Sequence, residues 1–219
     1  KKDIFIVVPS IQHNFNLTPK EIDFDKDMNP IKSSGSVEVF EAPIKGRTYV
    51  CTVDVSRGVD KDYSAFIVFD VTQMPFKVVA IYKNNEVKPF VFPNIIEQVC
   101  KGYNRAHILT EVNDIGQQIA EALQFEIEYD NILMTTQKGR AGQVLGAMYS
   151  GRGSSLGVRM TKQIKRICCA NIKTLIEGDK VLVNSFKIIE EISTFTKRGQ
   201  SYQAEDGSND DLMMCCVMF

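Results

Sequence analysis

The sequence has few of the residues and motifs that several common classes of site require. Only two histidines occur, His13 and His107, and they lie far apart in the chain, so neither a His-based metal site nor a Ser-His-Asp triad is expected. The six cysteines form no C-x-x-C pair, so we expect reduced core cysteines in a reducing compartment rather than zinc sites or disulfides. The absence of G-x-x-x-x-G-K-[ST] excludes a P-loop nucleotide site from this chain.

Long apolar runs and a strong net charge are also missing. The run in KKDIFIVVPS is too short for the core of a signal peptide or for a bilayer span, so we predict a soluble protein with no membrane partner. Lys plus Arg number 26 against 27 for Asp plus Glu, and this balance neither predicts nor excludes a polyanionic partner. Because the chain lacks an initiating Met and ends abruptly in CCVMF, we expect it to be a fragment of a longer protein.

The composition predicts one compact domain with an appendage. Hydrophobic residues make up 44% of the 219 residues, which is enough for a substantial core. Residues 18–36 are polar and contain prolines, Asx residues and a Ser-Gly cluster. We therefore predict a linker or N-terminal arm over residues 1–45, with at most short strands, and a compact domain over residues 46–219.

Apolar patterning in the compact part predicts an α/β sheet with helices on its faces. Runs rich in Val, Ile, Phe and Tyr predict an antiparallel meander of three strands at 48–56, 64–71 and 76–83. Further strands are expected at 106–112 and 131–137, and helices are expected at 93–103, 114–125 and 161–178. Residues 137–161 predict a glycine-rich loop or hairpin, and residues 187–219 predict a helix, a hairpin turning at Arg198 and Gly199, and a last helix.

Three helix starts carry candidate N-caps. The expected caps are Asn113 or Asp114, then Thr161, and finally Ser208 or Asn209.

Four acidic residues stand where predicted strands end or a helix begins. Asp54 lies late in the first strand, where a carboxylate is costly unless a cation pairs with it. Glu111 ends the strand at 106–112, and Asp210 and Asp211 open the last helix. If the first and fourth strands are parallel neighbours, Asp54 and Glu111 lie side by side, and the last helix brings its aspartates to the same edge.

Such a convergence of carboxylates predicts a divalent cation. Carboxylates without a matching Lys or Arg repel one another by several kcal/mol. Oxygen-only ligands select Mg²⁺ or Mn²⁺, and two such ions about 3.5 to 4 Å apart stabilise both the attacking and the leaving oxygen of phosphodiester hydrolysis. Each acid alone has a simpler interpretation as a solvent-facing strand end or an ordinary helix cap. Together, their order is typical of an RNase H-like nuclease.

The segments that contain these acids resemble a known family. VDVSRGVDKDYSA, ILTEVND and EDGSNDDLMM resemble the three acidic motifs of the nuclease domain of phage large terminases, and the similarity extends over roughly residues 46–219. It is strongest to the large terminases of T-even-like tailed phages. The resemblance implies an RNase H-like (integrase-like) fold, in which helices flank a mixed central β-sheet with an added β-hairpin. It also implies a two-metal-ion endodeoxyribonuclease that cuts concatemeric double-stranded viral DNA in headful packaging and grips DNA during translocation.

The resemblance also assigns roles to individual residues. It implies metal binding and catalysis by Asp54, Glu111 and one or both of Asp210 and Asp211, with Mg²⁺ or Mn²⁺ as the cofactor. Asp62 matches a further acidic position, which binds metal through water or holds the turn. Adjacent helical residues point about 100° apart, so the choice between the two helix-start aspartates stays open. Some terminases have a histidine where this chain has Asn209, so no histidine role carries over there.

Other implications concern partners. The family's full-length protein has an N-terminal packaging ATPase, which the missing P-loop shows to be absent from this chain. The implied partners are double-stranded DNA and, for the full-length protein, its own ATPase domain, the portal and the small terminase subunit. The implied location is the host cytoplasm during phage assembly, in the packaging motor on the prohead.

A basic stretch predicts the DNA surface. It contains no Asp or Glu between its first and last members, and it consists of Lys138, Arg140, Arg152, Arg159, Lys162, Lys165, Arg166 and Lys173. We predict that it forms one wall of a groove that binds duplex DNA by charge. A solvated helix face explains the lysines and arginine within 161–178 but not the arginines of the glycine-rich loop. Arg57 is expected to steady the scissile phosphate, with lesser contributions from Lys197 and Arg198.

Two other functions share this pattern of acids. One is a strand-transferase or resolvase of the integrase type, against which the absence of a DNA-end recognition domain counts. The other is a non-catalytic DNA clamp that has kept the fold, against which the intact acids in all three motifs count.

Overall fold

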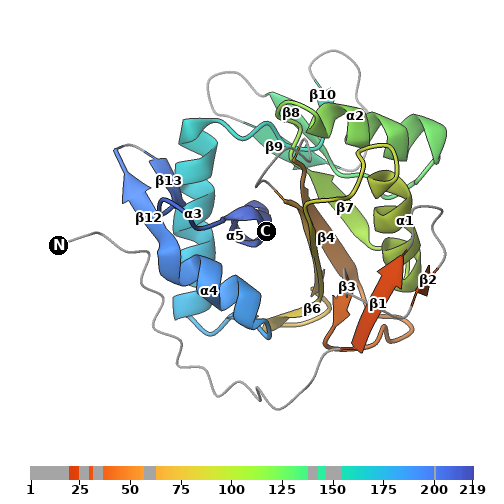
Figure 1. Cartoon of the computed structure of the whole chain (residues 1–219), viewed down its shortest axis with the longest axis horizontal. Helices are drawn as coiled ribbons and strands as arrows, with labels where there is room; N and C mark the ends of the chain where they lie inside the picture. Colours follow the sequence, from red (N-terminus) through yellow and green to blue (C-terminus); the bar gives the residue numbers. More distant parts are fainter. Residues whose placement is uncertain are drawn as a thin grey trace.

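The computed structural model describes residues 20–24, 30–31, 37–56, 63–137, 143–146, 154–199 and 201–219. An eight-stranded mixed sheet runs through the centre of the molecule (Figure 1). Its order is β2-β1-β3-β6-β5-β4-β7, and β11 pairs with β6 beside this path. The strands are β1 (Lys20–Phe24), β2 (Pro30–Ile31), β3 (Val37–Val39), β4 (Tyr49–Asp54), β5 (Ser64–Asp70), β6 (Phe76–Asn84), β7 (His107–Thr110) and β11 (Val181–Leu182).

The predicted antiparallel meander is confirmed by the pairing of β4 with β5 and of β5 with β6. Every residue of β5 is buried, as its apolar sequence SAFIVFD favours for a central strand. The parallel pairing considered for the first and fourth strands is present, because β4 runs parallel to β7. These two strands bring their carboxyl ends to the same edge of the sheet.

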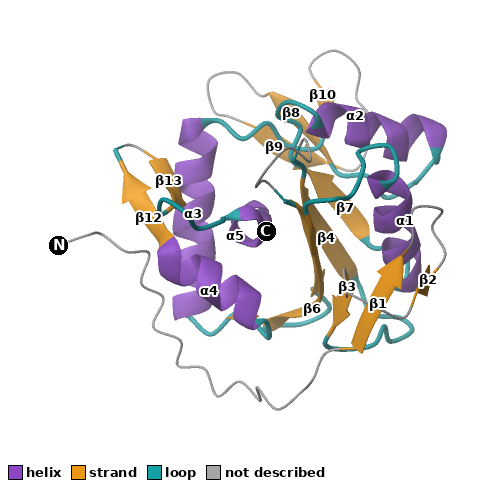
Figure 2. Ribbon diagram, in the orientation of Figure 1, coloured by secondary structure: helices purple, strands orange, loops and turns teal. Residues whose placement is uncertain are grey.

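Helices cover both faces of the sheet (Figure 2). One face packs against α1 (Phe92–Gly102) and α2 (Gly116–Glu121), which continues as a π-helix, η1 (Ala122–Glu126). The other face packs against α3 (Lys162–Glu177), α4 (Phe186–Thr194) and α5 (Asp211–Met218). The helix α5 lies between the sheet and α3 and α4, in contact with β4 and β5, so its first residues reach the edge where β4 ends.

Two smaller β structures complete the fold. A three-stranded sheet has the order β10-β8-β9, with bounds Ser154–Leu156, Met134–Gln137 and Gln143–Gly146. The hairpin β12 (Phe195–Arg198) and β13 (Ser201–Ala204) joins α4 to the segment before α5. Gly199 has a φ of +61° in its turn, which is a conformation that glycine adopts readily. The mixed sheet, the flanking helices and the hairpin confirm the predicted RNase H-like fold class.

Several local predictions hold and others need correction. Thr161 caps α3, because its side chain accepts a hydrogen bond from the Ile164 N–H at 3.2 Å. The cap of α5 is Asp210, not Ser208 or Asn209, so only Asp211 belongs to its first turn.

The predictions for strand 131–137 and for the start of the second helix are also corrected. The strand over residues 134–137 pairs with β9 and β10 instead of extending the central sheet, although Ile132 still bridges Ile108 of β7. The helix α2 begins at Gly116, two residues later than expected, and the Asn113 side chain donates to Glu111 instead of capping a helix.

The proposed boundary at residue 45 separates the strands before it from the rest of the central sheet to which they belong. The strand β3 precedes it and pairs with β6, while β1 pairs with β3. An arm that ends at residue 45 therefore contributes three strands, β1, β2 and β3, to the sheet of the compact domain. Among the helices of the described ranges, none combines the length and the apolar character needed to cross a bilayer.

Candidate active site

The register of β4 and β7 places Asp54 and Glu111 side by side. Val53 pairs with Thr110, and the Glu111 N–H donates to the Val53 carbonyl at 2.9 Å, so the next residues on both strands are neighbours. Asp54 is opposite Ala65 of β5, a member of the core under α3, α4 and α5. Because side chains alternate across a strand, Asp54 points to the face on which α5 lies.

The backbone and one side chain hold Glu111 in place. Asn113 donates its side-chain amide to Glu111 Oε1 at 2.7 Å and to the Met160 carbonyl at 3.0 Å. Two glycines permit a close approach of the chain to this strand end. A Cβ on Gly116 would lie 1.8 Å from the Glu111 carbonyl oxygen, and one on Gly157, whose φ is +70°, would lie 2.1 Å from the Thr110 carbonyl oxygen. Glycine is therefore required at both positions.

The two aspartates that start α5 have different partners. Asp210 Oδ2 accepts from the Ala204 N–H at 3.3 Å and lies 3.8 Å from Lys165 Nζ. Asp211 Oδ1 accepts from the Tyr63 N–H at 3.3 Å. Asp211 Oδ2 lies 3.3 Å from Lys83 Nζ but has no aligned hydrogen bond to any described residue, although it is buried.

Electrostatic interactions link the four carboxylates. Burial raises the pKa of Asp54 well above its ordinary value, and the charges of Glu111, Asp211 and Asp210 raise it further, against partial compensation by Lys165. Burial also raises the pKa of Glu111, which Lys165 opposes and Asp210 reinforces. Asp210 therefore acts on both strand acids. Asp54 is the carboxylate influenced by all three of the others.

Two lysines provide positive charge at this cluster. Lys165 of α3 lies 5.5 Å from the centre of the Phe195 ring and lowers the pKa of both Asp54 and Glu111. Lys83, at the end of β6, forms an ion pair with Glu191 of α4 in addition to its approach to Asp211. Burial alone lowers the pKa of Lys83, but the Glu191 and Asp211 carboxylates outweigh this effect and raise it.

The site has the donor chemistry of a hard metal ion. Its candidate ligands are carboxylate oxygens, which suit Mg²⁺ or Mn²⁺, and the buried Asp211 Oδ2 has an unused hydrogen-bonding capacity. Within the described ranges, no three His, Cys, Asp or Glu side chains are gathered closely enough to hold one ion. Asp211 instead lies near Lys83, and Asp210 lies near Lys165. These positive charges reduce the repulsion between the carboxylates.

Only part of the predicted DNA surface can be located. Five predicted site residues lie outside the described residues, namely Arg57, Asp62, Lys138, Arg140 and Arg152. Arg159, Lys162 and Arg166 are exposed at or just before the start of α3. Lys173 lies 3.7 Å from Glu177 on the same helix. Lys165 differs from these residues, since it approaches the carboxylates.

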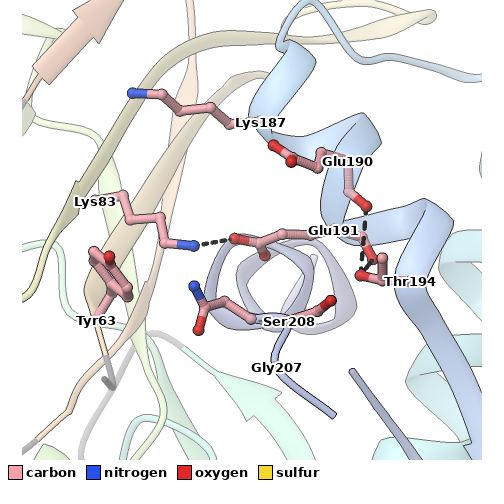
Figure 3. Close-up of a pocket in the computed structure, with 9 residues that line it drawn as sticks. Tyr63, Lys83, Lys187, Glu190, Glu191, Thr194, Gly207 and Ser208 are labelled. Carbon is pink, nitrogen blue, oxygen red and sulfur yellow. Dashed lines mark hydrogen bonds and ion pairs between the residues drawn. The ribbon is translucent and has the colours of Figure 1, made fainter. Parts of the chain in front are cut away.

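Four further residues support the site although the sequence did not single them out for it. These are Asn113, Tyr63, Lys83 and Glu191. Asn113 alone had a local signal, because it follows Glu111 by two residues in ILTEVND. Figure 3 shows Tyr63, Lys83 and Glu191 lining a cavity of about 440 Å³ between β6 and α4.

The fold and the arrangement of acids together define an RNase H-like domain of the terminase type. The chain belongs to the terminase RNaseH-like domain family, whose model matches residues 51–219.

Solved structures with the same fold include phage terminase nucleases. The large terminase nuclease from thermophilic phage G20c with bound magnesium has 17% identity and a TM-score of 0.64, covering 97% of each chain. The Thermus phage P74-26 large terminase nuclease domain has 20% identity and a TM-score of 0.60, covering 85% of each chain. The human cytomegalovirus terminase nuclease domain has 11% identity and a TM-score of 0.50, covering 79% of this chain and 82% of that chain.

Proposed function

We propose that this chain is the metal-dependent endonuclease domain of a phage large terminase, which cuts concatemeric double-stranded DNA during headful packaging and grips DNA during translocation. The observation that carries the proposal is the cluster of four interacting carboxylates, Asp54, Glu111, Asp210 and Asp211, at one edge of an RNase H-like sheet. Burial and mutual repulsion raise the pKa of Asp54, so the cluster favours a bound cation. The similarity of its motifs to T-even-like phages supports that group as the source.

The ion ligands in this proposal are Asp54, Glu111, Asp210 and Asp211, with Asp62 as an auxiliary acid. Two Mg²⁺ or Mn²⁺ ions would activate the attacking water and stabilise the leaving 3′ oxygen. Asp54 would be the central ligand of this set, because its charge interacts with all three other acids. G20c large terminase nuclease structures with bound magnesium, cobalt and zinc support a divalent ion in this fold.

The chain's own residues orient these ligands. Asn113 fixes one oxygen of Glu111, and the Tyr63 N–H fixes one oxygen of Asp211. The carboxylates are therefore held by donors from residues that flank β7 and β5, which reduces the ordering that ion binding requires.

The DNA partner is proposed to lie across the start of α3. Lys162, Arg166 and Arg159 are exposed there, and Lys165 from the same helix reaches the acids. The basic residues outside the described ranges would extend this surface, and Arg57 would contact the scissile phosphate. In the full-length protein we expect an ATPase domain, the portal and the small terminase subunit as partners, on the prohead in the host cytoplasm.

Plasmid nicking tests the proposal. We expect the chain to nick and linearise supercoiled plasmid with Mg²⁺ or Mn²⁺, and we expect Asp54→Ala to reduce cleavage by about 10³-fold or more, since it removes the central proposed ligand. Asp130→Ala is the matched control, because Asp130 is exposed and pairs with Arg105.

Two outcomes favour the alternatives. Plasmid that stays intact with the unaltered chain yet is retarded on a gel indicates a non-catalytic DNA clamp. Joining of one DNA end to another, rather than hydrolysis, indicates an integrase-type enzyme.

A further inference from the structure

Lys83 occupies a position that the sequence did not connect with the acidic motifs. It comes from the end of β6, its side chain is 14% exposed, and its ammonium lies 4.5 Å from the centre of the Tyr63 ring. The same ammonium donates a hydrogen bond to Glu191 Oε1 and lies 3.3 Å from Asp211 Oδ2 (Figure 3 shows the bond to Glu191). One largely buried cation therefore joins α4 and α5 through two carboxylates.

Glu191 fixes this arrangement from α4. Its Oε2 accepts from the Met213 N–H at 2.8 Å, in the first turn of α5. Within the described chain, the Asp210 side chain makes no capping bond at that helix start, so Glu191 supplies a cap from a neighbouring helix. The Glu191 carboxylate thus carries out two tasks, since one oxygen caps α5 and the other holds Lys83.

Lys83 and Asp211 interact through charge without an aligned hydrogen bond. Asp211 Oδ2 is buried and has no hydrogen-bond partner among the described residues, although the ammonium is within ion-pairing distance. Lys83 thus supplies the positive charge that a divalent cation would supply, but it leaves the oxygen's lone pairs unused. Its hydrogen bond belongs to Glu191.

We propose that Lys83 is the resident counter-cation of Asp211 and sets the affinity of the cluster for divalent ions, while Glu191 restrains Lys83. This inference rests on the proposed function because it takes Asp211 as an ion ligand. Ion binding exchanges one positive partner of Asp211 for another, and Lys83 keeps its bond to Glu191. Lys83 and Glu191 are positioning residues in this scheme, since they act on the ion through Asp211.

The scheme predicts opposite effects for the two members of the pair. Removing the Lys83 charge leaves Glu191 and Asp211 uncompensated, which strengthens their attraction for a divalent cation. Neutralising Glu191 releases the full charge of Lys83 toward Asp211, which weakens that attraction. Glutamine at position 191 still accepts from the Met213 N–H, so the cap of α5 is kept while the charge is lost.

Direct Mn²⁺ binding tests the inference without measuring cleavage. The dissociation constant is obtained from the electron paramagnetic resonance signal of free Mn²⁺ for the unaltered chain, Lys83→Met and Glu191→Gln. We expect Lys83→Met to tighten Mn²⁺ binding and Glu191→Gln to weaken it, each by roughly tenfold. Lys83→Arg keeps the charge and should restore nearly unaltered binding. Lys101→Met is the control, because Lys101 pairs with Glu97 on the exposed side of α1.

Any result other than these opposite effects of Lys83→Met and Glu191→Gln counts against the inference. If both variants weaken binding, the pair has a structural role only, and if neither changes it, Lys83 does not compete with the ion. If the unaltered chain binds no Mn²⁺, the proposed function fails together with the inference. Where Lys83→Met does not fold, as judged by its melting curve, Lys83→Gln replaces it, because glutamine can still hydrogen-bond to Glu191 without a charge.

Discussion

Opposite ends of the β4–β5 strand pair each carry an aspartate, and the two are held differently. At one end Asp70, opposite Tyr49, accepts from Arg47 Nη1 at 2.6 Å and from the Thr72 N–H at 3.0 Å. Burial alone raises the pKa of Asp70, but Thr72 and Arg47 hold it below its ordinary value. At the other end, burial and three neighbouring acids raise the pKa of Asp54.

The comparison separates a structural carboxylate from a candidate functional one. Both residues end a β-strand that is part of the same sheet, so strand position does not distinguish them. The difference lies in what the chain places around them. Asp70 receives a cation and a hydrogen-bond donor from the chain, whereas Asp54 is surrounded mainly by further acids, which is an arrangement that an external ion can stabilise.

The largest expected effect comes from substituting a glycine at each end. Gly157→Ala should destabilise the domain by about 2 to 4 kcal/mol and strongly reduce cleavage, because the added Cβ would meet the Thr110 carbonyl beside Glu111. Gly46→Ala, next to Arg47, should cost about 1 kcal/mol, because its φ is +83° but the space around it is open. Urea unfolding and plasmid nicking measure both effects. Equal costs at the two glycines would contradict the close approach at the Glu111 end.

A smaller effect is expected on the pH dependence of stability without metal. The folded-state pKa of Asp54 is raised, so the unaltered chain loses stability as the pH rises from the unfolded pKa of about 3.9 through the folded pKa. Asp54→Asn removes this loss, and it should be more stable than the unaltered chain at pH 7 by about 1 to 3 kcal/mol. The measurement is urea unfolding in EDTA between pH 4 and pH 8.

The change in unfolding free energy caused by Asp70→Asn should have the opposite sign to that caused by Asp54→Asn. The folded-state pKa of Asp70 is lowered, so its contribution is present above the unfolded pKa and is lost as the pH falls through the folded pKa. Asp70→Asn should therefore destabilise the chain by about 1 kcal/mol at pH 7, since Arg47 is partly exposed, with a smaller difference in acid. Parallel pH profiles for the two variants would remove the distinction between the two ends.

The smallest effect concerns DNA affinity. Charge removal by Lys162→Gln and Arg166→Gln, on the α3 side of the acids, should each reduce the slope of log affinity against log salt by about 1. Lys45→Gln is the control at the Asp70 end, where Lys45 is also exposed. Binding of labelled duplex is followed by fluorescence anisotropy in Ca²⁺, which limits cleavage. A change for Lys45→Gln alone would locate the DNA surface at the opposite end.

Local patterns in the sequence correctly predicted the strands and the helix start that depend mainly on neighbouring residues. Val, Ile and Phe runs predicted β4, β5 and β6, and Thr161 predicted the start of α3 through its capping hydroxyl. The parallel pairing of β4 and β7 entered the sequence analysis only as the condition under which Asp54 lies beside Glu111, and the structure meets that condition. These features follow from residues near one another in the chain or from simple rules of connection.

The remaining features depend on contacts between distant residues. Lys83 and Glu191 are 108 residues apart, and neither belongs to a motif that indicates their ion pair. Asn113 was predicted as a possible helix cap, but its amide binds Glu111, which a local pattern cannot rank against capping. The cap of α5 was likewise assigned to Ser208 or Asn209, because the sequence does not reveal that Glu191 approaches from α4.

The burial of α5 has a consequence for how the site moves. Every residue from Leu212 to Met218 is buried between the sheet and the other two helices of that face, and Asp210 and Asp211 stand at its start. A segment enclosed in this way separates from its neighbours only at a free energy close to that of global unfolding. Its amide protons should therefore be among the slowest in the domain to exchange with solvent. Two of the candidate ligands are thus attached to one of the most slowly exchanging segments of the protein, and the helix that carries them opens only when the core itself opens.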